Sequence, residues 1–371
     1  MIDKQINHLL IAFKKIRQIL LWIVFVVTLP FNSPNTSAQT TNYTNNTQEA
    51  LGQAFINHLH QQYDIVEDYE INDYIRSIGH KIVQHTDSQK NFRFYVINNP
   101  SINAFAGPDG VIGIHTGLIA SASTEGELAS VIAHEIAHVT QEHLYRRMVL
   151  QSESTLPQIA SMIAAVLIGL QDPNAGMAAL LSSSAYQIEQ QLKYSRLHEY
   201  EADFAGINYL SLSGYNPYAM PDFFQKLANS YQHQGLSAPE ILRTHPLTEN
   251  RLAEAQARAA SLNQTNNHNN DETLKLIQQR LIRNYKFKPD QLNSALTENQ
   301  KCYAKALKEL SENSMFPSSI NCIERLIEMG EKQSLFHSIY LELLTHIQTN
   351  TPATPFGGGG GGLSTPIAVP G

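Results

Sequence analysis

The string His134–His138, with the sequence H-E-I-A-H, constrains this chain more than any other feature. It follows a T-x-x-E capping box at Thr124 and Glu127 and lies within apolar residues of helical spacing, so we expect a helix that begins near Thr124. Residues i and i+4 share a helix face, so both imidazoles would point to one spot. Two imidazole nitrogens suit Zn²⁺, and the Glu between them can act as a general base. The motif predicts His134 and His138 as zinc ligands and Glu135 as the base.

The third ligand decides which kind of zinc site this is. One protease class extends the motif to H-E-x-x-H-x-x-G-x-x-H, but those extra positions hold Gln141 and Leu144 here, which excludes that class. His143 falls one residue short of the last position. A helix rotates about 100° per residue, so His143 would lie off the ligand face. We therefore predict a surface histidine at this position.

Other zinc sites take a Glu from a downstream helix, with an Asp one turn later. Glu199 and Asp203 have this spacing in a helix predicted over residues 193–212. Glu199 would complete a His₂Glu site, and Asp203 would accept the N–H of a ligating histidine. Glu201 is the competing ligand, although it would point to a different face from Asp203. Taken alone, these acids would also fit a solvated helix face.

Four motifs in order carry a family resemblance. They are His134–His138 with the preceding Leu128-Ala129, the string Ser195–Asp203, the element Asn103–Ala106, and Thr244–Leu247. Over about residues 51–260 the chain resembles the zinc peptidase family that includes HtpX and the CaaX prenyl proteases, and most closely its periplasmic branch. The resemblance implies a gluzincin-type endopeptidase with one Zn²⁺ per chain. It implies Glu199, rather than Glu201, as the third ligand, and Glu135 as general base and acid.

The resemblance also draws attention to His245 and Arg251. His245 could stabilise the oxyanion of the reaction, occupy a fourth zinc position and hold the enzyme latent, or simply lie at the start of a helix with Pro246 near its first turn. Arg251 could bind the oxyanion or pair with a helix acid. The strand Val111–His115 is expected along the cleft with an edge that pairs with substrate backbone, and His115 is expected to be structural.

The N-terminus predicts export. Residues 1–38 combine four basic residues and one acid with a short apolar run and end in small residues, as in a secretory signal peptide; a retained anchor is the alternative. Removal of this net +3 would take the formal charge from -7 to -10, which gives no reason to expect nucleic-acid binding. We therefore expect a periplasmic protein.

The fold class expected is α+β, mainly α. Short strands are predicted at residues 92–97, 104–106 and 111–115. The expected order is signal peptide 1–38, linker 39–50, zinc protease domain 51–260, linker 261–273, TPR-like helical hairpins 274–348, and a disordered Gly/Pro-rich tail 349–371. Cys302 and Cys322 could form a disulfide or remain buried thiols. The apolar region 159–181 could form buried helices or a membrane-facing lip.

These expectations favour a zinc endopeptidase of envelope quality control. The resemblance implies misfolded or stalled envelope proteins as substrates and partners, outer-membrane β-barrels and their assembly machinery among them. The apolar region 159–181 allows peripheral membrane contact, and the net charge predicts no nucleic-acid partner. A peptide-binding chaperone or adaptor with a latent zinc site is the first alternative, since helical repeats form concave binding surfaces. A membrane-embedded protease is the second, and it requires region 159–181 to span a bilayer.

Overall fold

The computed structural model describes residues 37–151, 185–234, 239–262, 270–285, 296–314, 317–330 and 334–350. The chain divides into two compact units, Met1–Ala50 and Leu51–Gly371. The predicted signal peptide up to residue 36, the apolar region 159–181 and the tail from residue 351 lie outside the described residues. None of the described helices is long and apolar enough to cross a membrane.

Helix α2 (Ser37–Gln62) runs through the stretch that the sequence predicted as a loose linker. Residues 39–50 are therefore helical, and the prediction of a loop was wrong. Asn and Thr have modest helix propensity but do not forbid a helix. A helix that is anchored by packing at one end extends at little cost, because each further residue adds a hydrogen bond without a new nucleation step. The anchor here is the second part of α2, where Phe55 and Leu59 are buried.

The three predicted strands form one mixed sheet. Strands β1 (Arg93–Ile97), β2 (Ala104–Ala106) and β3 (Val111–His115) lie in the order β1-β3-β2. Strand β3 runs parallel to β1 and antiparallel to β2, and all five of its residues are buried. The expected free edge on β3 was therefore wrong, because β3 is the central strand. The edge strand that pairs with β3 in antiparallel orientation is β2.

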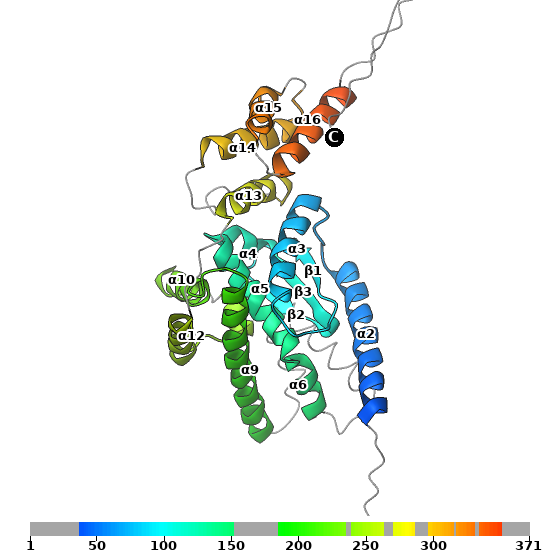
Figure 1. The fold of residues 1–371 in the computed structure, drawn as a ribbon, viewed down its shortest axis with the longest axis vertical. Coiled ribbons are helices and arrows are strands. Elements are labelled where there is room, and N and C mark those ends of the chain that lie inside the picture. The colour runs from blue at the N-terminus through cyan, green and yellow to red at the C-terminus, as the bar shows by residue number, and fades with distance from the viewer. Residues whose placement is uncertain are drawn as a thin grey trace, which may run out of the picture. The chain divides into compact units, whose positions relative to one another are not determined.

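Helices cover both faces of this sheet (Figure 1). On one face, α3 (Tyr69–Val83) and α5 (Glu125–Thr140) share the main core with Ile112 and Ile114 of β3. On the other face, the second part of α2 packs on Phe105 and Val111. The remaining elements of this region are η1 (Pro108–Gly110), α4 (Thr116–Ser121), α6 (His143–Gln151), α9 (Ala185–Leu212), α10 (Ala219–Gln234), α11 (Glu240–Thr244) and α12 (Glu249–Ser261).

The start of α5 is the predicted one. Thr124 is the N-cap, and its hydroxyl accepts the N–H of Glu127 at 3.2 Å. The second arm of the expected box is displaced by one residue, since the Glu127 carboxylate accepts the N–H of Ser123 at 2.7 Å. Lys226 of α10 pairs with the same carboxylate at 2.7 Å. The H-E-x-x-H helix thus begins at a fixed residue, which sets the direction in which its histidines point.

Helices α5 and α9 meet through a seam of small residues: Ala133, Ala137, Ala202, Ala205 and Gly206. Ala137, Ala202 and Ala205 form one buried cluster. A Cβ atom added to Gly206 would lie 3.2 Å from both the carbonyl oxygen of Ala133 and the backbone nitrogen of His134. The small side chains let the two backbones approach closely beside His134.

The predicted C-terminal helices are all present among the described residues. They are α13 (Asp271–Tyr285), α14 (Glu298–Ser311), α15 (Ile320–Glu328) and α16 (Ser334–Asn350), and their order is consistent with helical repeats. Arg280 of α13 is buried and pairs with Asp68, the N-cap of α3, at 3.0 Å and with Glu342 of α16 at 2.9 Å. One arginine therefore connects the sheet-covering helices to the last helix.

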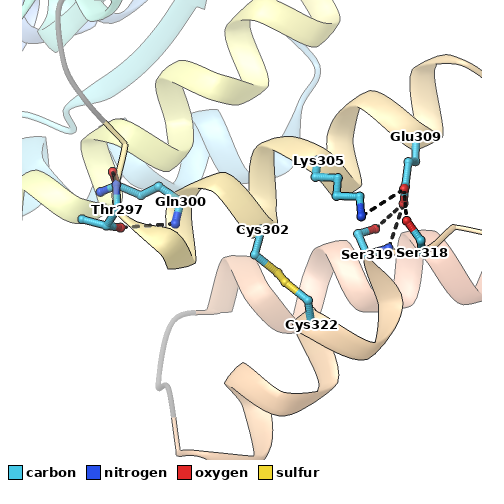
Figure 2. Close-up of a disulfide and its surroundings, with 8 residues drawn as sticks. All are labelled: Thr297, Gln300, Cys302, Lys305, Glu309, Ser318, Ser319 and Cys322. Carbon is cyan, nitrogen blue, oxygen red and sulfur yellow. Dashed lines mark hydrogen bonds and ion pairs between the residues drawn. A yellow bond between two sulfur atoms is a disulfide. The ribbon is translucent and has the colours of Figure 1, made fainter.

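A disulfide joins Cys302 of α14 to Cys322 of α15, with Cα atoms 6.2 Å apart (Figure 2). This decides the question that the sequence left open between a disulfide and two thiols. The same two helices are also held by Glu309, whose carboxylate accepts the backbone N–H of Ser319 at 2.9 Å. A carboxylate at a helix N-terminus is stabilising, so α14 and α15 are linked covalently and electrostatically.

Candidate metal centre

Four side chains form one compact cluster: His134, His138, Glu199 and His245. One ligand atom from each lies within 4.8 Å of the others. The Nε2 atoms of the two α5 histidines are 3.0 Å apart, and His245 Nδ1 is 3.1 Å from both oxygens of Glu199. Three predicted ligands are thus brought together, and His245 lies with them. Three imidazole nitrogens and one carboxylate are a donor set that suits Zn²⁺.

The charges around the cluster also fit a cation. Burial opposes a charge on His134, but hydrogen bonds to Asp203 and Glu199 outweigh it and raise the pKa of His134 to about 10. The Nδ1 atom of His134 lies 3.0 Å from Asp203 Oδ1, as predicted. Burial likewise opposes ionisation of Glu199, yet the charge of His245 and the hydrogen bond with His134 hold its pKa well below the usual value. Burial instead lowers the pKa of His138 well below its usual value, which favours the neutral imidazole that binds a metal.

Glu135 lies beside the cluster with an unused carboxyl group. It is fully buried, and neither carboxyl oxygen has a hydrogen-bond partner among the described residues. Burial raises its pKa above the usual value, although the charges of His245 and His134 and the neighbouring backbone of Ala106 oppose the shift. His245 Nε2 is 3.5 Å from Oε1. A carboxyl group with a raised pKa and no fixed partner is suited to proton transfer.

Arg251 is occupied by acids rather than free to bind a substrate oxygen. Its side chain is 2% exposed and donates to both oxygens of Asp203 at 2.7 and 2.8 Å. It also donates to the Pro246 carbonyl at 2.9 Å and lies 3.1 Å from Glu199 Oε2. Of the two roles that the sequence left open, this arrangement favours pairing with the helix acids.

His245 ends one helix and does not begin another. It is the C-cap of α11, and its N–H donates to the Ile241 carbonyl at 2.8 Å. The expected helix start at Pro246 was wrong, because α12 begins at Glu249 with Thr248 as its N-cap. Thr248 has an extended backbone, and its hydroxyl accepts the N–H of Arg251. This extended connection places the imidazole against Glu199.

His143 lies beside the cluster, in contact with His138. It was predicted to be a surface residue, but it is 3% exposed, and its Nδ1 lies 2.8 Å from Nδ1 of His138. The prediction assumed that α5 continues beyond Thr140. Instead, the helix ends there, and Glu142 takes a left-handed conformation with φ of 55°, which turns His143 back toward the cluster. A glutamate at this position carries no signal for such a turn, which asparagine or glycine would have.

Glu201 is drawn to His143 and not to the cluster. Its Oε2 lies 3.0 Å from His143 Nε2 and pairs with Arg146 of α6. The expectation that Glu201 points away from the face of Asp203 agrees with these contacts. The competing ligand therefore has partners of its own outside the group of four.

Strand β2 is an edge strand of the sheet, and the backbone of its residue Ala106 neighbours the carboxyl group of Glu135. Asn103 accepts a hydrogen bond from the N–H of His115 at its carbonyl oxygen, and Gly107 donates to the Val111 carbonyl. Backbone groups alternate in direction along a strand, so those of Ala104 and Ala106 face away from β3. A peptide in extended conformation could pair with this edge.

Comparison with known proteins agrees with the site. The model of peptidase family M48 matches residues 70–259, about half of the chain. A putative beta-barrel assembly-enhancing protease of Vibrio cholerae is 40% identical over 209 residues, which cover 56% of this chain and 43% of the relative. The beta-barrel assembly-enhancing protease of Escherichia coli K12 is 40% identical over 210 residues, with the same coverage of 56% and 43%.

A more distant relative matches a shorter region. The mitochondrial metalloendopeptidase OMA1 of Arabidopsis thaliana is 29% identical over 170 residues, 45% of this chain and 32% of the relative. The matches to the bacterial relatives span less than half of their length. Residues 70–259, which the family model matches, contain all four residues of the cluster.

Proposed function

This chain belongs to peptidase family M48 of zinc metallopeptidases, and from that premise we propose that it cleaves misfolded or stalled proteins of the bacterial envelope, outer-membrane β-barrels among them. The observation that carries the proposal is the cluster His134, His138, Glu199 and His245 with the unpartnered Glu135 beside it. The substrate class is supported by similarity to proteases named for β-barrel assembly.

The proposed location is the periplasm. The N-terminal sequence has the composition of a signal peptide. The Cys302–Cys322 disulfide supports the same location, because structural disulfides persist in the oxidising periplasm and are rare in the cytosol. Cys302 and Cys322 lie outside residues 70–259, which the family model matches, so the disulfide supports this location independently of the family match.

In the proposed mechanism, zinc, when bound, supplies Lewis acidity that polarises the scissile carbonyl and lowers the pKa of water. His134, His138 and Glu199 would hold it. Glu135 takes the proton of the attacking water and later delivers it to the leaving amine, which its buried carboxyl with a raised pKa is suited to do. The substrate backbone lies along β2, which holds a peptide without reading its side chains.

We assign His245 to a resting state. Its Nδ1 lies among the ligand atoms, so the distances support a fourth-ligand role better than an oxyanion donor. A resting enzyme with all four positions filled by protein would be latent until His245 moves away, because a catalytic site needs an open position. The same feature favours the alternative of a peptide-binding chaperone whose zinc site stays closed.

The test compares the mature wild-type chain with Glu135→Gln and His245→Ala. Zinc per chain is measured first, and then cleavage of casein and of an unfolded outer-membrane β-barrel. We expect one zinc in all three proteins. Cleavage should fall by about 10²–10⁴-fold in Glu135→Gln, the usual contribution of a general base. It should rise in His245→Ala.

Three outcomes would contradict parts of this proposal. A wild-type chain without zinc would refute the zinc site. Unchanged cleavage in Glu135→Gln would refute the role of the base. Cleavage of casein without any cleavage of the unfolded β-barrel would refute the substrate class and leave the peptidase activity standing.

A further inference from the structure

Each of the two histidines on α5 directs one ring nitrogen to the cluster and the other ring nitrogen to a partner outside it. His134 directs Nε2 to the cluster, and its Nδ1 is 3.0 Å from Asp203 Oδ1. His138 also directs Nε2 to the cluster, 3.0 Å from His134 Nε2 and 3.5 Å from Glu199 Oε1. Its Nδ1 is 2.8 Å from His143 Nδ1. The partner of His138 is therefore a histidine, where that of His134 is a carboxylate.

The contacts of His138, His143 and Glu201 are consistent with only one arrangement of protons. A histidine that binds a metal through Nε2 carries its proton on Nδ1, so His138 must donate to its neighbour. His143 then accepts at Nδ1 and carries its own proton on Nε2. That nitrogen lies 3.0 Å from Glu201 Oε2, a hydrogen-bond acceptor. Each nitrogen and oxygen in the sequence His138, His143, Glu201 thus has a defined role as donor or acceptor.

The residues that follow His138 in this series are held in place by their neighbours. His143 is 3% exposed, and its ring stacks on His198 at 4.3 Å between centroids with 14° between planes. The Glu201 side chain is 32% exposed, and Arg146 pairs with the same oxygen that faces His143. The partner of His134 is anchored in the same way, because Asp203 is paired with Arg251. Both ligand histidines therefore lead to a carboxylate that is fixed by an arginine.

We propose that His143 is a positioning residue that fixes the tautomer and ring orientation of His138 and relays the charge of Glu201 to it. Glu201 lies two residues after Glu199 and on another face of α9, where its contacts are with His143 and Arg146. His143 connects Glu201 to His138, because it contacts both residues. The inference rests on the proposed zinc site and extends it to a residue outside the four ligands. Partners of this kind hold ligands in place and raise their basicity.

The test measures zinc affinity of the full mature chain after metal removal, by competition with a chromophoric chelator. His143→Leu keeps much of the volume but removes the acceptor. His143→Asn keeps an oxygen acceptor close to the position of Nδ1. His115→Leu is the matched control, because His115 is 2% exposed and bonded to Ser101, on β3 and outside the cluster. Near-ultraviolet circular dichroism checks that each apoprotein is folded.

We expect His143→Leu to weaken zinc binding by about 10–100-fold, the usual effect of losing such a partner. His115→Leu should stay close to the wild type. His143→Asn keeps the acceptor but loses the Nε2 that reaches Glu201, so it should lie, like Glu201→Gln, between His143→Leu and the wild type. The visible spectrum of the Co²⁺-loaded protein should change in His143→Leu and be restored in His143→Asn.

Wild-type affinity in His143→Leu would overturn the inference, and so would equal weakening in His143→Asn, which would indicate packing alone. If His143→Leu does not fold, the zinc affinity of Glu201→Gln tests the inference instead. Wild-type affinity in Glu201→Gln would overturn the proposed role of Glu201. A wild-type chain that binds no zinc refutes the proposed function itself, so the two failures are distinguishable.

Discussion

Replacing Arg251 by Met tests whether this arginine is structural or catalytic. The substitution removes three hydrogen bonds, two to Asp203 and one to the Pro246 carbonyl, from a side chain that is 2% exposed. It leaves the buried Asp203 carboxylate without its arginine partner, so that His134, 3.0 Å away, is its remaining cationic neighbour. Removal of one partner of a buried ion pair costs about 3–5 kcal/mol, so the free energy of unfolding of the apoprotein should fall by this amount.

The assay is urea unfolding of chelator-treated protein, which keeps zinc binding out of the comparison. Arg283→Met is the control, because Arg283 pairs with Glu342 at side-chain exposures of 23% and 29%. That variant should lose no more than about 1 kcal/mol, as for solvated pairs. Adding Asp203→Asn to Arg251→Met should recover part of the loss, since it removes the carboxylate that has lost its arginine partner. Unchanged stability of Arg251→Met with a large loss of kcat would refute this reasoning and favour an oxyanion role.

Two further predictions concern other parts of the fold. Replacing both Cys302 and Cys322 by Ala should lower the free energy of unfolding by about 3 kcal/mol, from the loop entropy for a sequence separation of 20, and should make stability insensitive to reductant; equal stability of the oxidised and reduced wild type would contradict it. Burial lowers the pKa of His115 to about 4, so the unfolded chain binds more protons between pH 6.5 and 4 and stability falls as the pH falls. From pH 7 to 5 the loss due to His115 should be about 2 kcal/mol, and urea unfolding of His115→Asn should lack this part of the decrease.

The features that the sequence predicted well depend on local spacing. His134 and His138 are one helical turn apart, and so are Glu199 and Asp203, so each pair shares a face whatever the rest of the fold does. The capping box at Thr124 set the start of α5 correctly. Membership of the zinc peptidase family then followed from the order of such local motifs.

The features that were missed depend on how the chain turns between elements. His143 joins the site only because Glu142 adopts a positive φ, and no residue preference in the sequence predicted this conformation. The strand order β1-β3-β2 is a property of the assembled sheet, so the hydrophobic strand at Val111 could not be recognised as central from its own residues. Arg251 remained ambiguous in the sequence because its partners come from α9, about 50 residues earlier in the chain.

The small-residue seam between α5 and α9 has a consequence for engineering. The distance between the histidines of one helix and the acid of the other is set by contact between backbones at Ala133 and Gly206, and not by the ligands themselves. Transplanting His134, His138 and Glu199 onto two helices of an unrelated bundle would therefore fail if larger residues separated the helix axes. A design that carries the seam along with the ligands would reproduce the spacing, because the alanines and the glycine specify how near the two scaffold helices can lie.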